Sequence, residues 1–83
     1  MNRVLIRVYV PLLEKQYDVW VPISKSIYGV ILDLIKGINS MNKIEYDTES
    51  FPNLYNKESA DIYDLKSKII DTDIRNGTEV ILF

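Results

Sequence analysis

The sequence predicts an α+β fold of the β-grasp type, in which a mixed β-sheet packs on one main helix. Three observations support this prediction: a hairpin of alternating residues opens the chain, an amphipathic segment follows, and an apolar strand closes it. Together with the short strands expected between the helix and the last strand, these elements give the order ββαββ. If the last strand pairs with the first, the two run parallel at the centre of the sheet, and the helix lies across one face.

The N-terminal segment has the period of a half-buried hairpin. Apolar side chains at every second position share one face, and two arginines lie on the other, which predicts a strand over Arg3–Val10. Pro11 cannot donate to a strand ladder, so we expect the chain to turn there. The alternation resumes over Gln16–Val21, which predicts the second strand of the hairpin.

A single helix is expected after Pro22. Ser24 or Ser26 can accept a hydrogen bond from the free amides that open a helix. Apolar side chains then recur at three- and four-residue steps and share one face, namely Ile27, Ile31, Leu34, Ile35 and Ile38. This spacing predicts a helix from about Ser26 to Ile38, with Gly37 where the helix runs out.

The remaining chain is expected to be mostly short elements. Residues 39–53 are polar and predict a loop, with Ile44, Tyr46 and Phe51 as anchors onto the core. Beyond it, the sequence predicts a short strand at Leu54–Tyr55, an extended piece at Ile62–Tyr63, a helical turn within residues 65–74, a turn at Asn76-Gly77, and a buried strand over Thr78–Phe83. A ferredoxin-like βαββαβ fold is the alternative, but it needs a second full helix that residues 63–73 hardly supply. The expected core is Val4, Ile6, Val8, Val19, Ile27, Ile31, Leu34, Ile69 and Leu82.

Composition argues against most enzyme classes. The 83 residues make one domain, residues 1–83, and contain neither cysteine nor histidine, which removes thiolate nucleophiles, disulfides and the usual zinc ligands. The net charge of -2 lacks the cationic excess of nucleic-acid binders. No leader and no membrane-spanning segment are apparent. We therefore expect a cytoplasmic, non-enzymatic protein without cofactors, nucleic-acid partners or membrane insertion.

Three polar motifs have simple structural interpretations. Asp71 and Asp73 begin like a calcium loop, but the following residues lack the required glycine and glutamate, so a solvated turn is favoured. Asp61 and Asp64 resemble the paired carboxylates of an acid-base site, but the sequence offers no second group of polar residues to assist them. Exposed turn residues are therefore the favoured interpretation. The segment Ser24-Lys25-Ser26 has the composition of a serine-lysine site, but it lies at a helix start, where serine is an ordinary cap.

The outward face of the hairpin is the candidate binding surface. If Val8 and Val19 form a cross-strand pair, Arg7 lies opposite Trp20 and Tyr9 opposite Asp18 on the solvent side, with Leu5 nearby. A cation over an indole can be a self-satisfied cross-strand pair. Tryptophan, tyrosine and arginine are also the residues that dominate binding hot spots. Both interpretations stay open, and the predicted protein-binding residues are Leu5, Arg7, Tyr9 and Trp20.

Several segments resemble the YukD and EsaB ubiquitin-like proteins of bacterial type VII secretion. The junction Val19-Trp20-Val21-Pro22, with its serine cap and the helix opening at Ile27, is similar to theirs. So are Leu54-Tyr55-Asn56-Lys57, Ile62-Tyr63-Asp64-Leu65 and Ile74-Arg75-Asn76-Gly77-Thr78, which leads into Val80-Ile81-Leu82. The match covers nearly the whole chain apart from residues 39–51, and its motifs are structural.

The resemblance implies a ubiquitin-like accessory or regulatory protein that binds the ATPase or membrane components of the secretion machine. The sequence is rich in isoleucine, asparagine, lysine and tyrosine, a composition that is typical of proteins from AT-rich bacterial genomes such as those of Firmicutes. Sulfur carriers and protein modifiers of the same fold act through a Gly-Gly tail, whereas this sequence ends in Leu82-Phe83. The alternatives are such a carrier or modifier, or a stand-alone interaction domain of another pathway.

Overall fold

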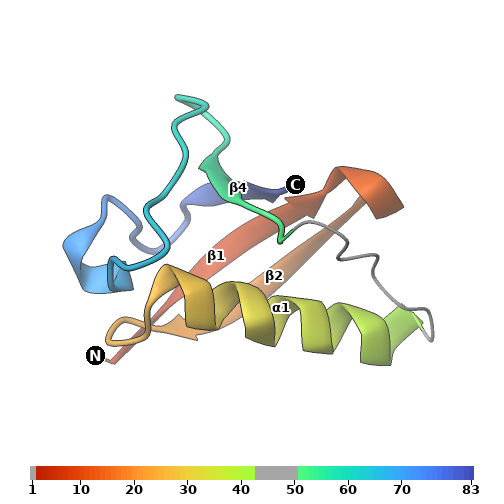
Figure 1. Cartoon of the computed structure of the whole chain (residues 1–83), viewed down its shortest axis with the longest axis horizontal. Helices are drawn as coiled ribbons and strands as arrows, with labels where there is room; N and C mark the ends of the chain where they lie inside the picture. The colour runs from red at the N-terminus through yellow and green to blue at the C-terminus, as the bar shows by residue number, and fades with distance from the viewer. Residues whose placement is uncertain (1, 43–50) are drawn as a thin grey trace.

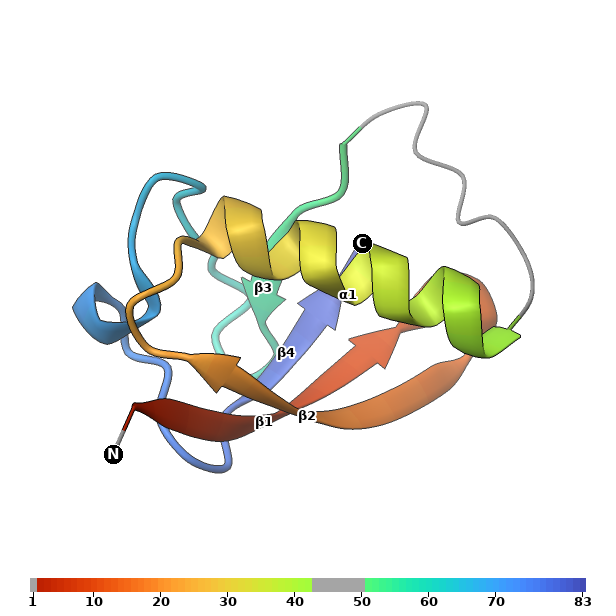
Figure 2. The same ribbon diagram turned by 90° about the horizontal axis from the view of Figure 1, so that it is seen from below.

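One four-stranded sheet and one helix form the molecule in a computed structural model, which describes residues 2–42 and 51–83. The strands are β1 (Arg3–Val10), β2 (Lys15–Pro22), β3 (Leu54–Asn56) and β4 (Glu79–Leu82), and they lie in the order β2-β1-β4-β3. Strand β1 is antiparallel to β2 and parallel to β4. The helix crosses one face of this sheet (Figures 1 and 2). The predicted β-grasp, with first and last strands paired in parallel at its centre, is confirmed.

The register of the hairpin differs from the prediction by two residues. The turn consists of the 3₁₀ segment η1 (Pro11–Leu13) and Glu14, which has a positive φ of 53°. This turn places Val8 opposite Tyr17, so the predicted pair of Val8 and Val19 is wrong. A shift of two residues keeps every side chain on its face of the sheet and changes only its cross-strand partner.

Helix α1 (Ile27–Asn42) begins where predicted and ends later than predicted. The Ser26 hydroxyl accepts a hydrogen bond from the Gly29 amide at 3.1 Å, so Ser26 is the cap. The helix runs through Gly37 because Ile38, one residue further, is buried in the core and holds the next turn in place. Of the predicted loop, residues 39–42 are helical, and the anchors Ile44 and Tyr46 lie outside the described residues.

The chain from residue 51 onward packs its side chains back onto the helix and sheet. Phe51 is half-buried and stacks on Tyr28 of α1, with 5.0 Å between ring centroids. Ile62 pairs with Tyr55 in an isolated bridge, as the predicted extended piece requires. The predicted helical turn is the 3₁₀ segment η2 (Ile69–Asp71), whose first two amides donate to carbonyls in the loop before α1. Within the described residues α1 is the only α-helix, so the ferredoxin-like alternative is wrong.

The core lies between the helix and the facing side of the sheet. Eight of the nine predicted core residues are buried, whereas Val19 is only partly buried because β2 is an edge strand that the helix does not fully cover. Seven further aliphatic residues of the described ranges are buried although they were not predicted, which are Val10, Val21, Val30, Ile38, Leu54, Ile74 and Val80, and Pro52 is buried as well. No polar or charged side chain of the described residues is buried in it.

The turn before β4 attaches the last strand to the first. Gly77 has a φ of +88°, and its amide donates to the Leu5 carbonyl at 2.8 Å. The Leu5 amide in turn donates to the Asn76 side-chain oxygen at 2.8 Å. The predicted Asn76-Gly77 turn therefore sets the point at which the parallel pairing of β1 and β4 begins.

Candidate protein-binding surface

The side of the sheet that faces away from α1 carries all four predicted binding residues. We call this side the outer face (Figure 2). Even-numbered residues of β1 are buried under the helix, so Leu5, Arg7 and Tyr9 point outward. Trp20 lies on the same side of β2, opposite Leu5. The predicted orientation is confirmed for all four residues, and their role in binding stays a prediction.

Trp20 is a large and exposed apolar residue of this face. The residue is 51% exposed, which is unusual for the largest apolar residue type. The guanidinium carbon of Arg3 lies over its ring at 5.2 Å from the centroid. The predicted pairing of Arg7 with Trp20 is wrong, because the two-residue shift of register places Leu5 opposite Trp20. The cation over the ring comes from Arg3, which lies opposite Pro22 and is a diagonal neighbour of Trp20. The cation and the indole still form one exposed unit.

Arg7 belongs to a different feature, a line of charges across the sheet. Its Nε lies 3.1 Å from Asp18 Oδ1, so the predicted pairing of Tyr9 with Asp18 is also wrong, and Tyr9 faces Gln16. On the other side of Arg7 the register partner is Glu79, whose carboxylate lies 3.4 Å from Lys57 Nζ. We call Asp18, Arg7, Glu79 and Lys57 the charged row.

An apolar group lies beside the charged row. Tyr9 of β1, Ile81 of β4 and Tyr55 of β3 are register partners across three neighbouring strands, and all are partly exposed. A shallow hollow of about 410 Å³ opens there, lined by Pro11, Tyr55, Ala60, Ile81 and Phe83. The outer face therefore combines an exposed tryptophan, four alternating charges and an apolar depression.

Most of the residues that surround the predicted binding residues on the outer face were not predicted from the sequence. Arg3 shares the strand parity of Arg7, so the alternating pattern already placed it on the outer face, but its diagonal contact with Trp20 depends on the register and on the side-chain positions. Glu79, Ile81 and Tyr55 come from strands that join the sheet through long-range pairing. No local spacing signals which of their side chains lie next to β1.

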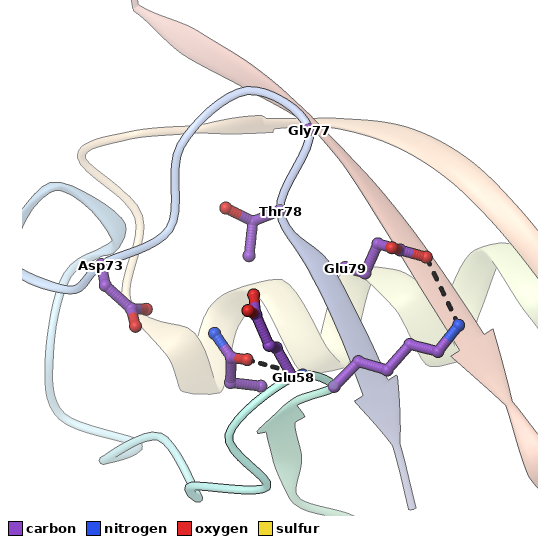
Figure 3. Close-up of a pocket in the computed structure, with 7 residues that line it drawn as sticks. Glu58, Asp73, Gly77, Thr78 and Glu79 are labelled. Atoms are coloured by element: carbon purple, nitrogen blue, oxygen red, sulfur yellow. Dashed lines mark hydrogen bonds and ion pairs between the residues drawn. The ribbon is translucent and has the colours of Figure 1, made fainter.

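A polar cleft of about 520 Å³ opens at the edge of the sheet near Gly77 (Figure 3). Its polar side chains hold the surrounding loops together. Asn56 accepts hydrogen bonds from the amides of Glu58 and Ser59 at 2.8 and 3.0 Å, and Tyr63 donates to Asp73 at 2.7 Å. The arrangement offers bonds that fix loops, and no nucleophile with an adjacent base.

The polar motifs considered from the sequence have structural partners. Asp64 accepts the Lys66 amide at 2.9 Å and closes a turn, while Asp61 is exposed. In the segment Ser24-Lys25-Ser26, the lysine forms an ion pair with Asp33 and the second serine caps α1. The aspartate Asp73 accepts from Tyr63, and the described residues contain no group of three or more candidate metal ligands.

The phenol of Tyr63 is partly buried, and its surroundings change its pKa. Burial and then the hydrogen bond to Asp73 raise its pKa from 10.0 to about 12, while the hydrogen bond from Asn56 acts in the opposite direction. Burial and the bond to Asp73 both stabilise the neutral phenol, which links the end of β3 to the loop that follows η2.

Replacing Tyr63 by phenylalanine is expected to make the free energy of unfolding fall less steeply at high pH. The phenol holds its proton more tightly in the folded chain, so its contribution is fully present below pH 10 and is lost as the pH rises through about 12. Urea midpoints of wild type and Tyr63→Phe, measured across that interval, should converge as the pH rises. Curves that run parallel throughout would show that Tyr63 does not couple protonation to folding.

No protein-family model matches the sequence, and no curated protein matches it significantly. Several solved structures do match. A chain of the MycP5-free ESX-5 inner membrane complex in state II aligns with all of this chain at TM-score 0.82 and 13% identity, and this chain spans 21% of it. The EccD5 ubiquitin-like domain from Mycobacterium xenopi aligns with all of this chain and 94% of its own length, at TM-score 0.81 and 11% identity.

The fold is the ubiquitin-like β-grasp. A third match agrees: the ubiquitin-like domain of the type VII secretion system protein EccD1 of Mycobacterium tuberculosis aligns over 99% of this chain and 98% of its own length, at TM-score 0.78 and 10% identity. At these identities the likeness concerns the ubiquitin-like fold alone. No α-helix in residues 2–42 and 51–83 of this ubiquitin-like chain is long and apolar enough to span a bilayer.

Proposed function

We propose that this ubiquitin-like chain is a non-enzymatic accessory or regulatory protein of a type VII secretion system that acts by non-covalent protein binding. The observation that carries the proposal is the half-exposed Trp20, held under Arg3 and beside Leu5 on the outer face. The likeness in fold to EccD ubiquitin-like domains and the resemblance to YukD and EsaB support the pathway.

The chemistry of this surface favours binding over a purely structural role. An indole over which a guanidinium is already placed gains most when a partner removes both from water, because cation–π attraction strengthens on desolvation. Tryptophan and arginine are enriched among residues that dominate interface energies. Both side chains project from the paired strands β1 and β2, so a partner would lose little entropy in ordering them.

The proposed partners are the ATPase or the membrane components of the secretion machine, met in the cytoplasm. A chain of the ESX-5 inner membrane complex contains a region similar to this whole chain, which supports a place near such a complex. The charge of -2 and the absence of histidine and cysteine support protein binding over nucleic-acid binding or catalysis.

Removing the exposed unit is expected to stop secretion while leaving the fold intact. The double change Arg3→Ala and Trp20→Ala deletes one cation and one indole from a half-exposed site, so the unfolding free energy should change by less than about 1 kcal/mol. Loss of an anchor of this type weakens binding by about 2 kcal/mol or more. The readout is secretion of a WXG100-type substrate by a host strain that lacks the native gene and carries each variant.

A matched control lies on the opposite side of the molecule. Leu32 and Lys36 are exposed on α1, and the change of both to alanine also removes one large apolar group and one cation. This control should restore secretion as well as wild type does. Normal secretion by the deletion strain would refute the pathway, whereas full secretion with the Arg3 and Trp20 variant would refute the surface alone.

A further inference from the structure

The charged row crosses the whole outer face and alternates in sign. Its order follows the order of the strands: Asp18 on β2, Arg7 on β1, Glu79 on β4, and Lys57 directly after β3. The Lys57 amide donates to the Glu79 carbonyl at 3.0 Å, which keeps this residue in line with the sheet. All four charged side chains remain about half-exposed, so their charges are accessible to a second molecule.

Because its four charges alternate in sign, the charged row of one molecule is complementary to the charged row of a second molecule that runs in the opposite direction. In a symmetric dimer of two sheets packed face to face, the two-fold axis lies between the sheets. An axis parallel to the strands reverses the row, which places Arg7 over the partner's Glu79 and Asp18 over the partner's Lys57. An axis across the strands would place every charge over its own copy, and like charges repel.

We propose that two copies of this chain associate through their outer faces about a two-fold axis parallel to the strands. Every charge of the row then meets an opposite charge of the partner, in addition to its neighbour on the same sheet. This association goes beyond the proposed function. It also covers Trp20, so a secretion partner would bind the single chain and compete with the second copy.

The apolar group fits the same symmetry. The rotation that reverses the charged row also reverses the neighbouring row, so Tyr9 of one copy lies over the partner's Ile81 and Gln16 over the partner's Tyr55. The apolar hollow is covered in both copies, as the interior of two packed sheets requires. Charges and apolar side chains thus select one arrangement.

Trp20 provides a local signal for this arrangement. On the edge strand β2 it lies level with Leu5, and the rotation carries it to the far side of the partner's sheet, where the polar cleft opens beside Gly77. The chain has one tryptophan, so its fluorescence reports this contact without labels. The emission should shift as the protein concentration is raised.

Charge reversal tests the pairing directly. We expect wild type to form a dimer in sedimentation velocity, and Arg7→Glu and Glu79→Arg each to weaken association at least tenfold, because each creates two like-charge contacts per dimer. An equimolar mixture of the two variants should restore dimers of wild-type affinity, since each contact then joins opposite charges again. Both variants keep their altered intramolecular neighbour in the mixture, so only contacts between molecules explain the recovery.

Lys36→Glu is the matched control, because it makes the same change of net charge on the exposed side of α1. It should dimerise like wild type, and circular dichroism should show all variants folded. A wild-type protein that stays monomeric up to about 1 mM overturns the proposal. So does a dimer that Arg7→Glu leaves unchanged, that Lys36→Glu weakens equally, or that the mixture of variants does not restore. A monomeric protein whose Arg3 and Trp20 variant fails in secretion would leave the proposed function standing and assign the face to another protein.

Discussion

Replacing Ile31 by alanine is expected to lower the free energy of unfolding by about 2 to 5 kcal/mol. Ile31 is fully buried in the first half of α1, where the helix packs on the sheet. Its truncation removes apolar contacts and leaves a cavity that the surrounding side chains fill only in part. A domain of this size has roughly 5 to 15 kcal/mol of stability, so a large share would be lost.

The adjacent residue is the matched control for this prediction. Leu32 lies on the same helix and is 44% exposed, so Leu32→Ala removes a similar side chain from a site that is already half in water. We expect its cost to stay below about 1 kcal/mol. Urea unfolding followed by far-ultraviolet circular dichroism measures both variants. Equal costs at the two positions would contradict the helix orientation described above.

Replacing Gly77 by alanine is expected to destabilise the fold by about 1 to 2 kcal/mol. The φ of +88° at Gly77 is one that residues with a Cβ rarely adopt, and no described atom beyond its two chain neighbours lies within 4 Å of the position that the Cβ would take. The cost therefore comes from backbone strain and not from a clash. Because the Gly77 amide also donates to Leu5, relaxation of the turn would weaken the start of the β1–β4 pair.

Replacing Gly37 by alanine is expected to change the stability of the fold in the opposite direction. Gly37 too has open space where a Cβ would lie, but it is inside α1. Alanine is favoured over glycine within a helix by up to about 1 kcal/mol, so Gly37→Ala should stabilise the protein. Urea midpoints of the two variants should therefore move in opposite directions from wild type. A loss of stability at both positions would show that the space around Gly37 is not open.

The alternating pattern of β1 was sufficient to predict the strand, its buried side and the outward side of the hairpin. The pattern has period two, so it carries no information about a shift by two residues. That shift depends on how the turn between β1 and β2 is folded, and in particular on the positive φ of Glu14. Glutamate has no special preference for that conformation, so the sequence did not reveal it.

The end of α1 and the charged row were missed for different physical reasons. Glycine often follows the last turn of a helix, which made Gly37 resemble a stop signal, but the burial of Ile38 outweighs its low propensity. The charged row joins four strands whose order and register arise from tertiary pairing. Asp18 and Arg7 could be placed on one side of the hairpin, but Glu79 and Lys57 could be added only once β3 and β4 were aligned.

The pairing of the first strand with the last also governs how the chain acquires its structure during synthesis. The bond from the Leu5 amide to Asn76 joins residues 71 positions apart, and the central strand β4 is made last. Until β4 has been synthesised, the inner edge of β1 has no partner and the apolar side of the hairpin is only partly covered. Contacts this distant along the chain slow folding, because a long loop must close before they form. The domain should therefore complete its fold only after β4 has left the ribosome, and until then the exposed hairpin is its most aggregation-prone segment.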